Sequence, residues 1–144
     1  MVREQLSRCS YLSWEFIDAI DGKKLKSDPP EYNRKRAKRL MGWTLSNAEV
    51  ACFLSHRLAW QKCLARNKTI LILEDDCLIK PTLPAAIDFA GDHSSSWDIL
   101  RLQALHEHGS MRIIKRNGKF DMVQNERDPF GSTAYLVKPA TAAI

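Results

Sequence analysis

The sequence has no long run of apolar residues, and this absence excludes several classes of protein. No stretch approaches the roughly 18 consecutive apolar residues that a membrane-spanning helix needs. Residues 1–16 also lack the continuous apolar segment of a secretory signal, so we expect no export signal. The 144 residues, of which 44% are hydrophobic and 27% charged, are enough for one globular domain with its own core.

Paired cysteines are absent as well, because the four cysteines are scattered along the chain as Cys9, Cys52, Cys63 and Cys77. No two of them form a C-x-x-C pair, which excludes a zinc ribbon and a thioredoxin-like redox motif. Without an export signal, the simplest interpretation is that these thiols stay reduced in the cytosol. We therefore expect a cytoplasmic protein.

The positive charge is not spread over the chain but comes from one short segment. Residues 33–39 read NRKRAKR, and the five cations of this run equal the whole net charge of +5. A solvated, mobile loop explains such a run, and so does a contact with phosphates or with an anionic membrane surface. A nucleic-acid-binding protein would more often carry a basic face over its whole fold, with aromatic residues interleaved for base stacking. We therefore expect no nucleic acid as a partner.

Hydrophobic spacing predicts an alternation of helices and strands along the chain. Residues 23–44 are polar and basic, and we expect a long basic loop there, with one short helix near 33–40. Ser46-Asn47-Ala48-Glu49 is a capping box that opens an amphipathic helix. The expected elements are a helix end at 2–9, a strand at 14–22, a helix at 47–66, a strand at 69–74, a helix at 81–90, a strand at 97–103, a hairpin at 111–123 that turns at Asn117-Gly118, and a strand followed by the start of a helix at 131–144.

The strand at 69–74 is aliphatic throughout, without polar alternation. Such a strand is buried on both faces, which is typical of a parallel sheet with helices on either side. The order of elements therefore predicts an α/β fold with a mixed, mainly parallel sheet flanked by helices.

Three carboxylates, Glu74, Asp75 and Asp76, directly follow this strand. Like charges this close make ionisation of each neighbour more costly. A divalent cation would remove that cost, whereas a solvated turn would tolerate it, and both interpretations remain open. In an open α/β sheet, ligands bind at the carboxyl ends of the strands, and hard cations prefer carboxylate oxygens. If the chain stayed extended, Glu74 and Asp76 would point to one side and Asp75 to the other.

Three ordered motifs together resemble glycosyltransferase family 25, the lipooligosaccharide and lipopolysaccharide sugar transferases with relatives that act on collagen hydroxylysine. They are LSNAEVACFLSHRLAW at 45–60, ILILEDDC at 70–77 and GSTAYLVKPATAA at 131–143. The resemblance spans residues 14–144, nearly all of the chain.

The resemblance implies a GT-A fold and an inverting transfer of a hexose, galactose or glucose, from a UDP-sugar donor to a cell-surface glycolipid. It makes Glu74-Asp75-Asp76 the analogue of the family's D-x-D motif. Asp76 would hold Mn²⁺ or Mg²⁺ against the diphosphate of the donor, and Glu74 would contact the metal or the ribose. For His56, a role at the donor site stands beside a simple packing role.

Two further roles are expected at the site. Arg101 could reach a phosphate, although a structural role is equally open. The general base that inverting transfer needs is best sought at Asp128, with Asp98, Glu107, Glu126 and a residue outside this chain as the alternatives. Asp98 stands at the start of a predicted strand, far from the carboxyl ends where the site would lie, which favours a structural role for it.

The chain differs from the family pattern at both ends. The resemblance implies that it starts after the family's first strand and stops soon after the Ala-Tyr-Leu strand, so we expect a single, partial GT-A domain over residues 1–144. An incomplete sheet would expose strand edges, which favours a homo-oligomer that covers them. The alternative to an active enzyme is an inactive remnant that binds at most nucleotide. Contact of residues 34–39 with an anionic membrane would place the protein at the inner face of the cytoplasmic membrane.

Overall fold

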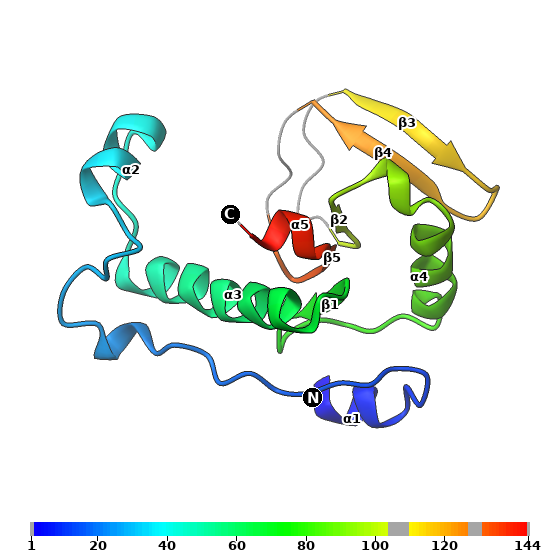
Figure 1. Cartoon of the computed structure of the whole chain (residues 1–144), viewed down its shortest axis with the longest axis horizontal. Coiled ribbons are helices and arrows are strands. Elements are labelled where there is room, and N and C mark those ends of the chain that lie inside the picture. Colours follow the sequence, from blue (N-terminus) through cyan, green and yellow to red (C-terminus); the bar gives the residue numbers. More distant parts are fainter. Residues whose placement is uncertain (1, 104–109, 127–130, 144) are drawn as a thin grey trace. The chain divides into compact units, whose positions relative to one another are not determined.

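The computed structural model describes residues 2–103, 110–126 and 131–143 (Figure 1). The chain forms two compact units. The first, here called the sheet unit, comprises Met1–Trp14 and Cys63–Ile144, and the second, the helical unit, comprises Glu15–Lys62. Within the described ranges, no helix is both long enough and apolar enough to cross a membrane.

The centre of the sheet unit is a three-stranded sheet in the order β1-β5-β2, formed by β1 (Ile70–Leu73), β5 (Ala134–Val137) and β2 (Ile99–Arg101). Both outer strands pair antiparallel with β5. The expected mainly parallel sheet is therefore wrong. Since β1 and β2 are both antiparallel to β5, they run in the same direction, and α4 (Leu83–Asp92) connects them as a crossover helix. The position between them is taken by the later strand β5, so the two parallel strands are not neighbours.

The most buried element of this sheet is β5 rather than β1. All four residues of β5 are buried, and Val137 has no exposed surface, whereas the four residues of β1 are only half-buried. The register pairs Ile70 with Val137 and Leu73 with Ala134. Burial on both faces, which the aliphatic composition predicted for β1, is thus a property of the central strand.

A separate two-stranded sheet follows, formed by β3 (Met111–Arg116) and β4 (Asp121–Asn125). The predicted hairpin is confirmed, and a bulge between Ile113 and Lys115 shifts its register. The strands are joined through Gly118, whose φ of 81° suits a residue without a side chain. The Asn117 side chain accepts hydrogen bonds from the backbone N–H groups of Lys119 and Phe120, at 3.0 and 2.8 Å, which stabilises the turn.

Three short helical segments complete the sheet unit. They are α1 (Val2–Ser7), the 3₁₀ segment η2 (Ser94–Ser96) and α5 (Pro139–Ala142). The expected helices at 2–9 and after the strand at 131–144 are therefore confirmed. The second residue of α4 is Pro84, a position in the first helical turn where the missing N–H of proline costs no hydrogen bond.

The helical unit contains η1 (Gly22–Lys24), α2 (Arg34–Met41) and α3 (Asn47–Arg66), a helix whose last turn belongs to the sheet unit. Its core consists of Tyr32, Val50 and Leu54, with partly buried apolar residues around them. The basic run forms helix α2, which confirms the short helix expected near 33–40, whereas the interpretation of the run itself as a mobile loop is wrong. The helix forms because Asn33 caps it and the run consists mainly of strong helix formers.

The strand expected at 14–22 is not present. Its backbone does not pair with another strand in the described residues; instead the N–H of Ile20 donates to the hydroxyl of Ser55 on α3, at 2.9 Å. Of the apolar residues that suggested a strand, Ile20 packs against the core of this unit, whereas Phe16 is 45% exposed.

The start of α3 is the predicted capping box. The Ser46 hydroxyl accepts from the N–H of Glu49 at 3.3 Å, and the Glu49 carboxylate accepts from the N–H of Ser46 at 2.8 Å and from its hydroxyl at 2.7 Å. The backbone and hydroxyl donors of Ser46 hold the pKa of Glu49 below its usual range. The two residues therefore satisfy each other's hydrogen-bonding groups at the helix end.

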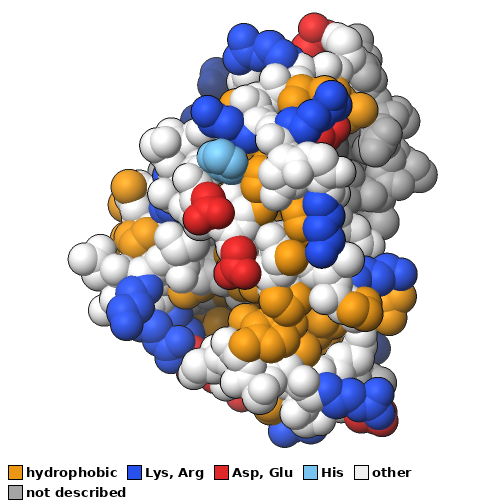
Figure 2. All heavy atoms as spheres, turned by 90° about the vertical axis from the view of Figure 1, so that its right-hand side faces the viewer, with side chains coloured by type: hydrophobic (Ala, Val, Ile, Leu, Met, Phe, Trp, Pro, Cys, Tyr) orange, Lys and Arg blue, Asp and Glu red, His pale blue; other side chains and the backbone are white. Residues whose placement is uncertain are grey.

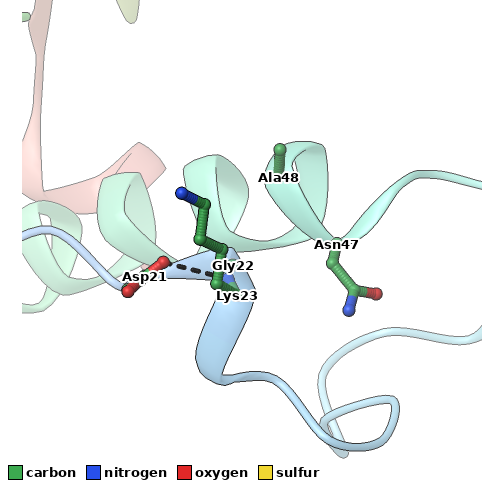
Figure 3. A pocket seen from close by; sticks show the side chains of 5 residues that line it. All are labelled: Asp21, Gly22, Lys23, Asn47 and Ala48. Atoms are coloured by element: carbon green, nitrogen blue, oxygen red, sulfur yellow. Dashed lines mark hydrogen bonds between the residues drawn. The ribbon is translucent and has the colours of Figure 1, made fainter.

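Gly22 lies directly against the first turn of α3 (Figure 3). A Cβ atom on Gly22 would lie 2.7 Å from the backbone oxygen of Asn47 and 2.9 Å from its carbonyl carbon. These are backbone atoms at a capped helix end, so they cannot move aside cheaply. A glycine is therefore required at this contact.

We expect Gly22→Ala to destabilise the protein, because either η1 or the start of α3 must move to accept the methyl group. The cost should be on the order of 1–3 kcal/mol, which is typical of overpacking. The control is Gly91→Ala in α4, where the added Cβ meets nothing within 4 Å apart from its chain neighbours and the nearby backbone of its own helix and alanine favours the helix by up to about 1 kcal/mol. Denaturant titration of both variants checks the difference. Equal stability of the two variants would contradict the close contact.

We expect Ser46→Ala to lower the free energy of unfolding by about 1 kcal/mol, the usual value of a helix N-cap. Denaturant titration measures the change, and Ser27→Ala, at an exposed position of the same unit outside any helix, is the matched control. If both variants were as stable as the unmodified chain, α3 would not depend on this cap.

Candidate functional site

The candidate site lies at one edge of the three-stranded sheet. Because β1 and β2 run in the same direction and β5 runs against them, the carboxyl ends of β1 and β2 meet the amino end of β5 at this edge. Backbone hydrogen bonds continue past the strands, from Glu74 N–H to the Thr133 oxygen at 2.8 Å and from Leu102 N–H to the Ala134 oxygen at 2.9 Å. The three segments after β1, after β2 and before β5 are therefore held together.

Glu74 is tied to this edge by its side chain. The Ser132 hydroxyl donates to the Glu74 carboxylate at 2.5 Å, and Glu74 is half-buried. A short hydrogen bond to a carboxylate is of the strong, charge-assisted kind. It therefore fixes the Glu74 side chain against the segment that enters β5.

Asp75 and Asp76 lie in a tight turn, which closes with a hydrogen bond from Cys77 N–H to the Glu74 oxygen at 3.2 Å. Both side chains are exposed. Since the chain turns here, the alternation expected for an extended strand stops at Leu73. The orientation predicted for Glu74 and Asp76 on one side therefore does not follow from strand geometry.

Gln5 of α1 makes two hydrogen bonds to the backbone that follows the acidic turn. The Gln5 side-chain amide donates to the Cys77 oxygen at 3.1 Å, and its oxygen accepts from the N–H of Ile79 at 2.8 Å. Val2 and Leu6, on the same helix, pack with Cys77 in a small core. Gln5 thus fixes the backbone that leaves the acidic turn.

Cys77 follows the carboxylates but is buried. Burial raises the pKa of its thiol, and the charges of Asp76 and Asp75 raise it further. Because the thiolate is the reactive form of cysteine, this residue is part of the packing and not a nucleophile.

A cavity of about 580 Å³ adjoins this edge, a size suited to a small-molecule ligand. It lies between α4, β2 and the start of β4, with apolar side chains such as Phe89 and Met122 and polar groups from Arg101, Gln103 and Asp121. Phe89 stacks on Phe120 with ring centroids 5.9 Å apart. Hydrophobic side chains also gather on the face of this unit that carries α1 and α4 (Figure 2).

A second hollow, of about 410 Å³, lies at the start of α3 and is lined by Asp21, Gly22, Lys23, Asn47 and Ala48 (Figure 3). The Asp21 carboxylate accepts from Lys23 N–H at 2.9 Å, and the helix end is already capped by Ser46 and Glu49. These polar groups are used within the fold, so we do not assign a function to this hollow.

The predicted site residues fall into three groups. Glu74, Asp75, Asp76 and Arg101 lie at the sheet edge just described, and Arg101 also lines the cavity. His56 lies half-buried on α3 within the helical unit, so its role stays a prediction. Asp128, the predicted general base, and Glu107 lie outside the described residues.

Asp98 has structural contacts. Lys138 N–H donates to the Asp98 backbone oxygen at 3.2 Å, and the Lys138 ammonium lies 3.5 Å from the Asp98 carboxylate. This contact is at the opposite end of β2 from Arg101, which agrees with the expectation that Asp98 is not part of the site.

Two residues with positioning contacts were missed by the sequence analysis. Ser132 lies inside the GSTAY motif, directly before the buried strand, and its place at a strand end could have suggested it. Gln5 offers no such signal, because a glutamine 72 residues from its partner in the sequence belongs to no local pattern.

The family model "Glycosyltransferase family 25 (LPS biosynthesis protein)" matches residues 2–143. A glycosyltransferase 25 family member of Aedes aegypti is 31% identical over 102 residues, covering 62% of this chain and 16% of the relative. The inactive glycosyltransferase 25 family member 3 of Mus musculus is 29% identical over 105 residues, covering 63% and 17%. The lipooligosaccharide biosynthesis protein lic2B of Haemophilus influenzae is 36% identical over 69 residues, covering 47% and 25%. The chain thus spans a quarter or less of the length of these relatives.

We expect Gln5→Leu to lower the free energy of unfolding by about 1–3 kcal/mol. Leucine has a similar size but leaves the Cys77 oxygen and the Ile79 N–H, both part-buried, without their hydrogen bonds. The matched control is Gln61→Leu, at an exposed position of α3, which should change stability little. Denaturant titration compares the two, and an equal effect would show that Gln5 does not hold the turn.

Proposed function

The chain belongs to glycosyltransferase family 25, and we propose that it carries the donor-binding part of an inverting hexosyltransferase. The proposed reaction moves galactose or glucose from a UDP-sugar to a cell-surface glycolipid of the lipooligosaccharide type. The observation that carries the proposal is the sheet edge where the Glu74–Asp76 turn, Ser132 and Arg101 meet beside a cavity of about 580 Å³. The description of the family as an LPS biosynthesis protein and the name of the Haemophilus relative support the acceptor class.

The residues of the acidic turn suit a hard divalent cation. Asp75 and Asp76 offer exposed carboxylate oxygens, and Glu74 offers a carboxylate that Ser132 already orients. Oxygen ligands of this kind are those that Mg²⁺ and Mn²⁺ prefer. When bound, such an ion neutralises the charge that develops on the departing nucleoside diphosphate.

The side chains of this unit would then have separate tasks. Asp76 and Glu74 would hold the ion, Gln5 would fix the backbone after the turn, and Arg101 would supply positive charge for a phosphate. In an inverting transfer, the acceptor hydroxyl attacks the anomeric carbon while the bond to the diphosphate breaks, and a base takes the hydroxyl proton. Asp128 remains the predicted base, and His56 a predicted residue of the donor site.

The GT-A fold belongs to the same proposal. Its support is the arrangement of β1, α4 and β2, two strands in one direction joined by a crossover helix, with the acidic turn at the carboxyl end of the first. The proposal has three further parts. The protein forms a homo-oligomer that covers the outer edges of β1 and β2, it is located in the cytoplasm, and residues 34–39 contact an anionic membrane.

An inactive protein is the second candidate. The Mus musculus relative carries the word inactive in its name, so this family includes a member that is called inactive. Such a protein would bind at most nucleotide and would not transfer sugar. Measuring UDP binding with and without Mn²⁺, and then transfer or hydrolysis of a UDP-sugar, separates the two candidates.

We expect Asp76→Asn to weaken Mn²⁺-dependent UDP binding by at least about tenfold, since even outer-shell partners of a metal affect its affinity by 10–100-fold. Calorimetry with UDP and Mn²⁺ measures the effect. The fold should be preserved, because the change removes one of three crowded like charges. The control is Asp92→Asn, at an exposed position of α4. Equal Mn²⁺-dependent affinities of the two variants would refute the metal assignment.

A further inference from the structure

We propose that helix α2 and the three apolar residues at its end, Leu40, Met41 and Trp43, form a docking surface for an anionic lipid bilayer. We call this set the α2 surface. It deepens the proposed function, because a glycolipid acceptor is itself anchored in a membrane. It is nevertheless built from residues of the helical unit alone, and none of them belongs to the candidate site.

The apolar part of the α2 surface is unusually exposed. Leu40, Met41 and Trp43 are 68%, 43% and 59% exposed. At 100° per residue, Leu40 and Met41 lie on either side of Ala37, and Ala37 packs against the core of Tyr32, Val50 and Leu54. The core of the unit therefore covers the middle of the apolar face of α2 and leaves its two flanks uncovered.

The polar part of the α2 surface is entirely basic. Four exposed cations follow one another along the helix, Lys35, Arg36, Lys38 and Arg39. The fifth, Arg34, is compensated by Asp28 through two hydrogen bonds of 2.7 and 2.8 Å. A short helix with an apolar face and a basic polar face matches the pattern of helices that lie in the lipid headgroup region.

The helix is held in place at both ends. Asn33 caps its start by accepting from Arg36 N–H at 2.9 Å, and Gly42, with a φ of 86°, ends it. The buried Tyr32 precedes the helix, and its hydroxyl accepts from Leu45 N–H beyond it at 2.8 Å. The residues before and after α2 are thus joined, so the surface is presented as a fixed part of the unit.

The composition favours a lipid surface over other occupants. A stable protein partner typically covers about 800 Å² on each side, far more than three half-exposed side chains provide. A nucleic acid would use the cations and stacking aromatics but has no use for Leu40 and Met41. A bilayer uses both, because the headgroups attract Lys and Arg while Leu, Met and Trp enter the interface.

The charge dependence is tested with vesicles of phosphatidylcholine and of equal parts phosphatidylcholine and phosphatidylglycerol, by co-sedimentation of the full chain. We expect binding to the anionic vesicles only, weakening as salt rises from about 0.1 M to about 0.5 M. The triple variant Lys35→Gln/Lys38→Gln/Arg39→Gln should bind roughly a hundredfold more weakly, at about fivefold per charge. The control, Lys23→Gln/Lys24→Gln/Lys26→Gln, removes the same number of exposed charges from the same unit. Its affinity for anionic vesicles should fall much less.

The apolar contribution is tested at Trp43. We expect Trp43→Ala to weaken binding to anionic vesicles by about tenfold, whereas Leu78→Ala, at an equally exposed position in the sheet unit, should have little effect. The tryptophan emission of the unmodified chain should shift to shorter wavelength with anionic vesicles. This shift should be lost in Trp43→Phe, which still binds.

The outcomes separate this proposal from its alternatives. Four results would each overturn it: an equal loss of vesicle binding in both triple variants, binding to neutral vesicles, tighter binding to nucleic acid than to vesicles, or a self-association that is lost in Trp43→Ala. UDP binding measured on the variants of the α2 surface and on the triple lysine control should not change. Failure of UDP binding in a chain that binds vesicles would refute only the proposed function, and the reverse result would refute only the α2 surface.

Discussion

The antiparallel insertion of β5 between β1 and β2 is the constraint on which the sheet unit depends. The outer strands have only four and three residues, and short isolated strands are marginal in water. β5 pairs with both, and its four residues, with Val137 fully buried, form the centre of the packing. Because β5 begins where β1 and β2 end, the same pairing brings Ser132 to Glu74. The candidate site is thus a direct result of the strand order.

The three adjacent carboxylates lie in different environments. Glu74 is half-buried and bonded to Ser132, while Asp75 and Asp76 lie exposed in the turn, where water lowers the cost of their charges. A turn that was merely solvated would not require the backbone behind it to be fixed, yet Gln5 binds that backbone on two sides of Leu78. This support from a separate helix favours a turn whose geometry matters for binding.

Local signals predicted the elements, and distant contacts decided their arrangement. The capping box at Ser46 and Glu49, the helix at 47–66 and the hairpin near Gly118 follow from neighbouring residues, and the structure confirms them. The sheet was predicted as mainly parallel because the strand at 69–74 is aliphatic throughout and because strands and helices alternate along the chain, and no local pattern shows that β5 enters between β1 and β2. The acidic turn was visible in the sequence, whereas the contact of Gln5 with it joins residues 72 positions apart.

In helix α2, the intrinsic propensity of the residues favours the helix, whereas repulsion between its cations disfavours it. Arg, Lys, Ala, Leu and Met favour a helix, and Asn33 and Gly42 define its ends. Its cations, however, face each other at i,i+4 positions, Arg34 with Lys38 and Lys35 with Arg39, and like charges at this spacing destabilise a helix by about 0.2–0.5 kcal/mol per pair. The bond between Arg34 and Asp28 relieves one of these pairs. An anionic surface would relieve the other, and a ligand that binds only the folded state stabilises it. Binding at α2 and the stability of the helical unit are therefore coupled through the same charges.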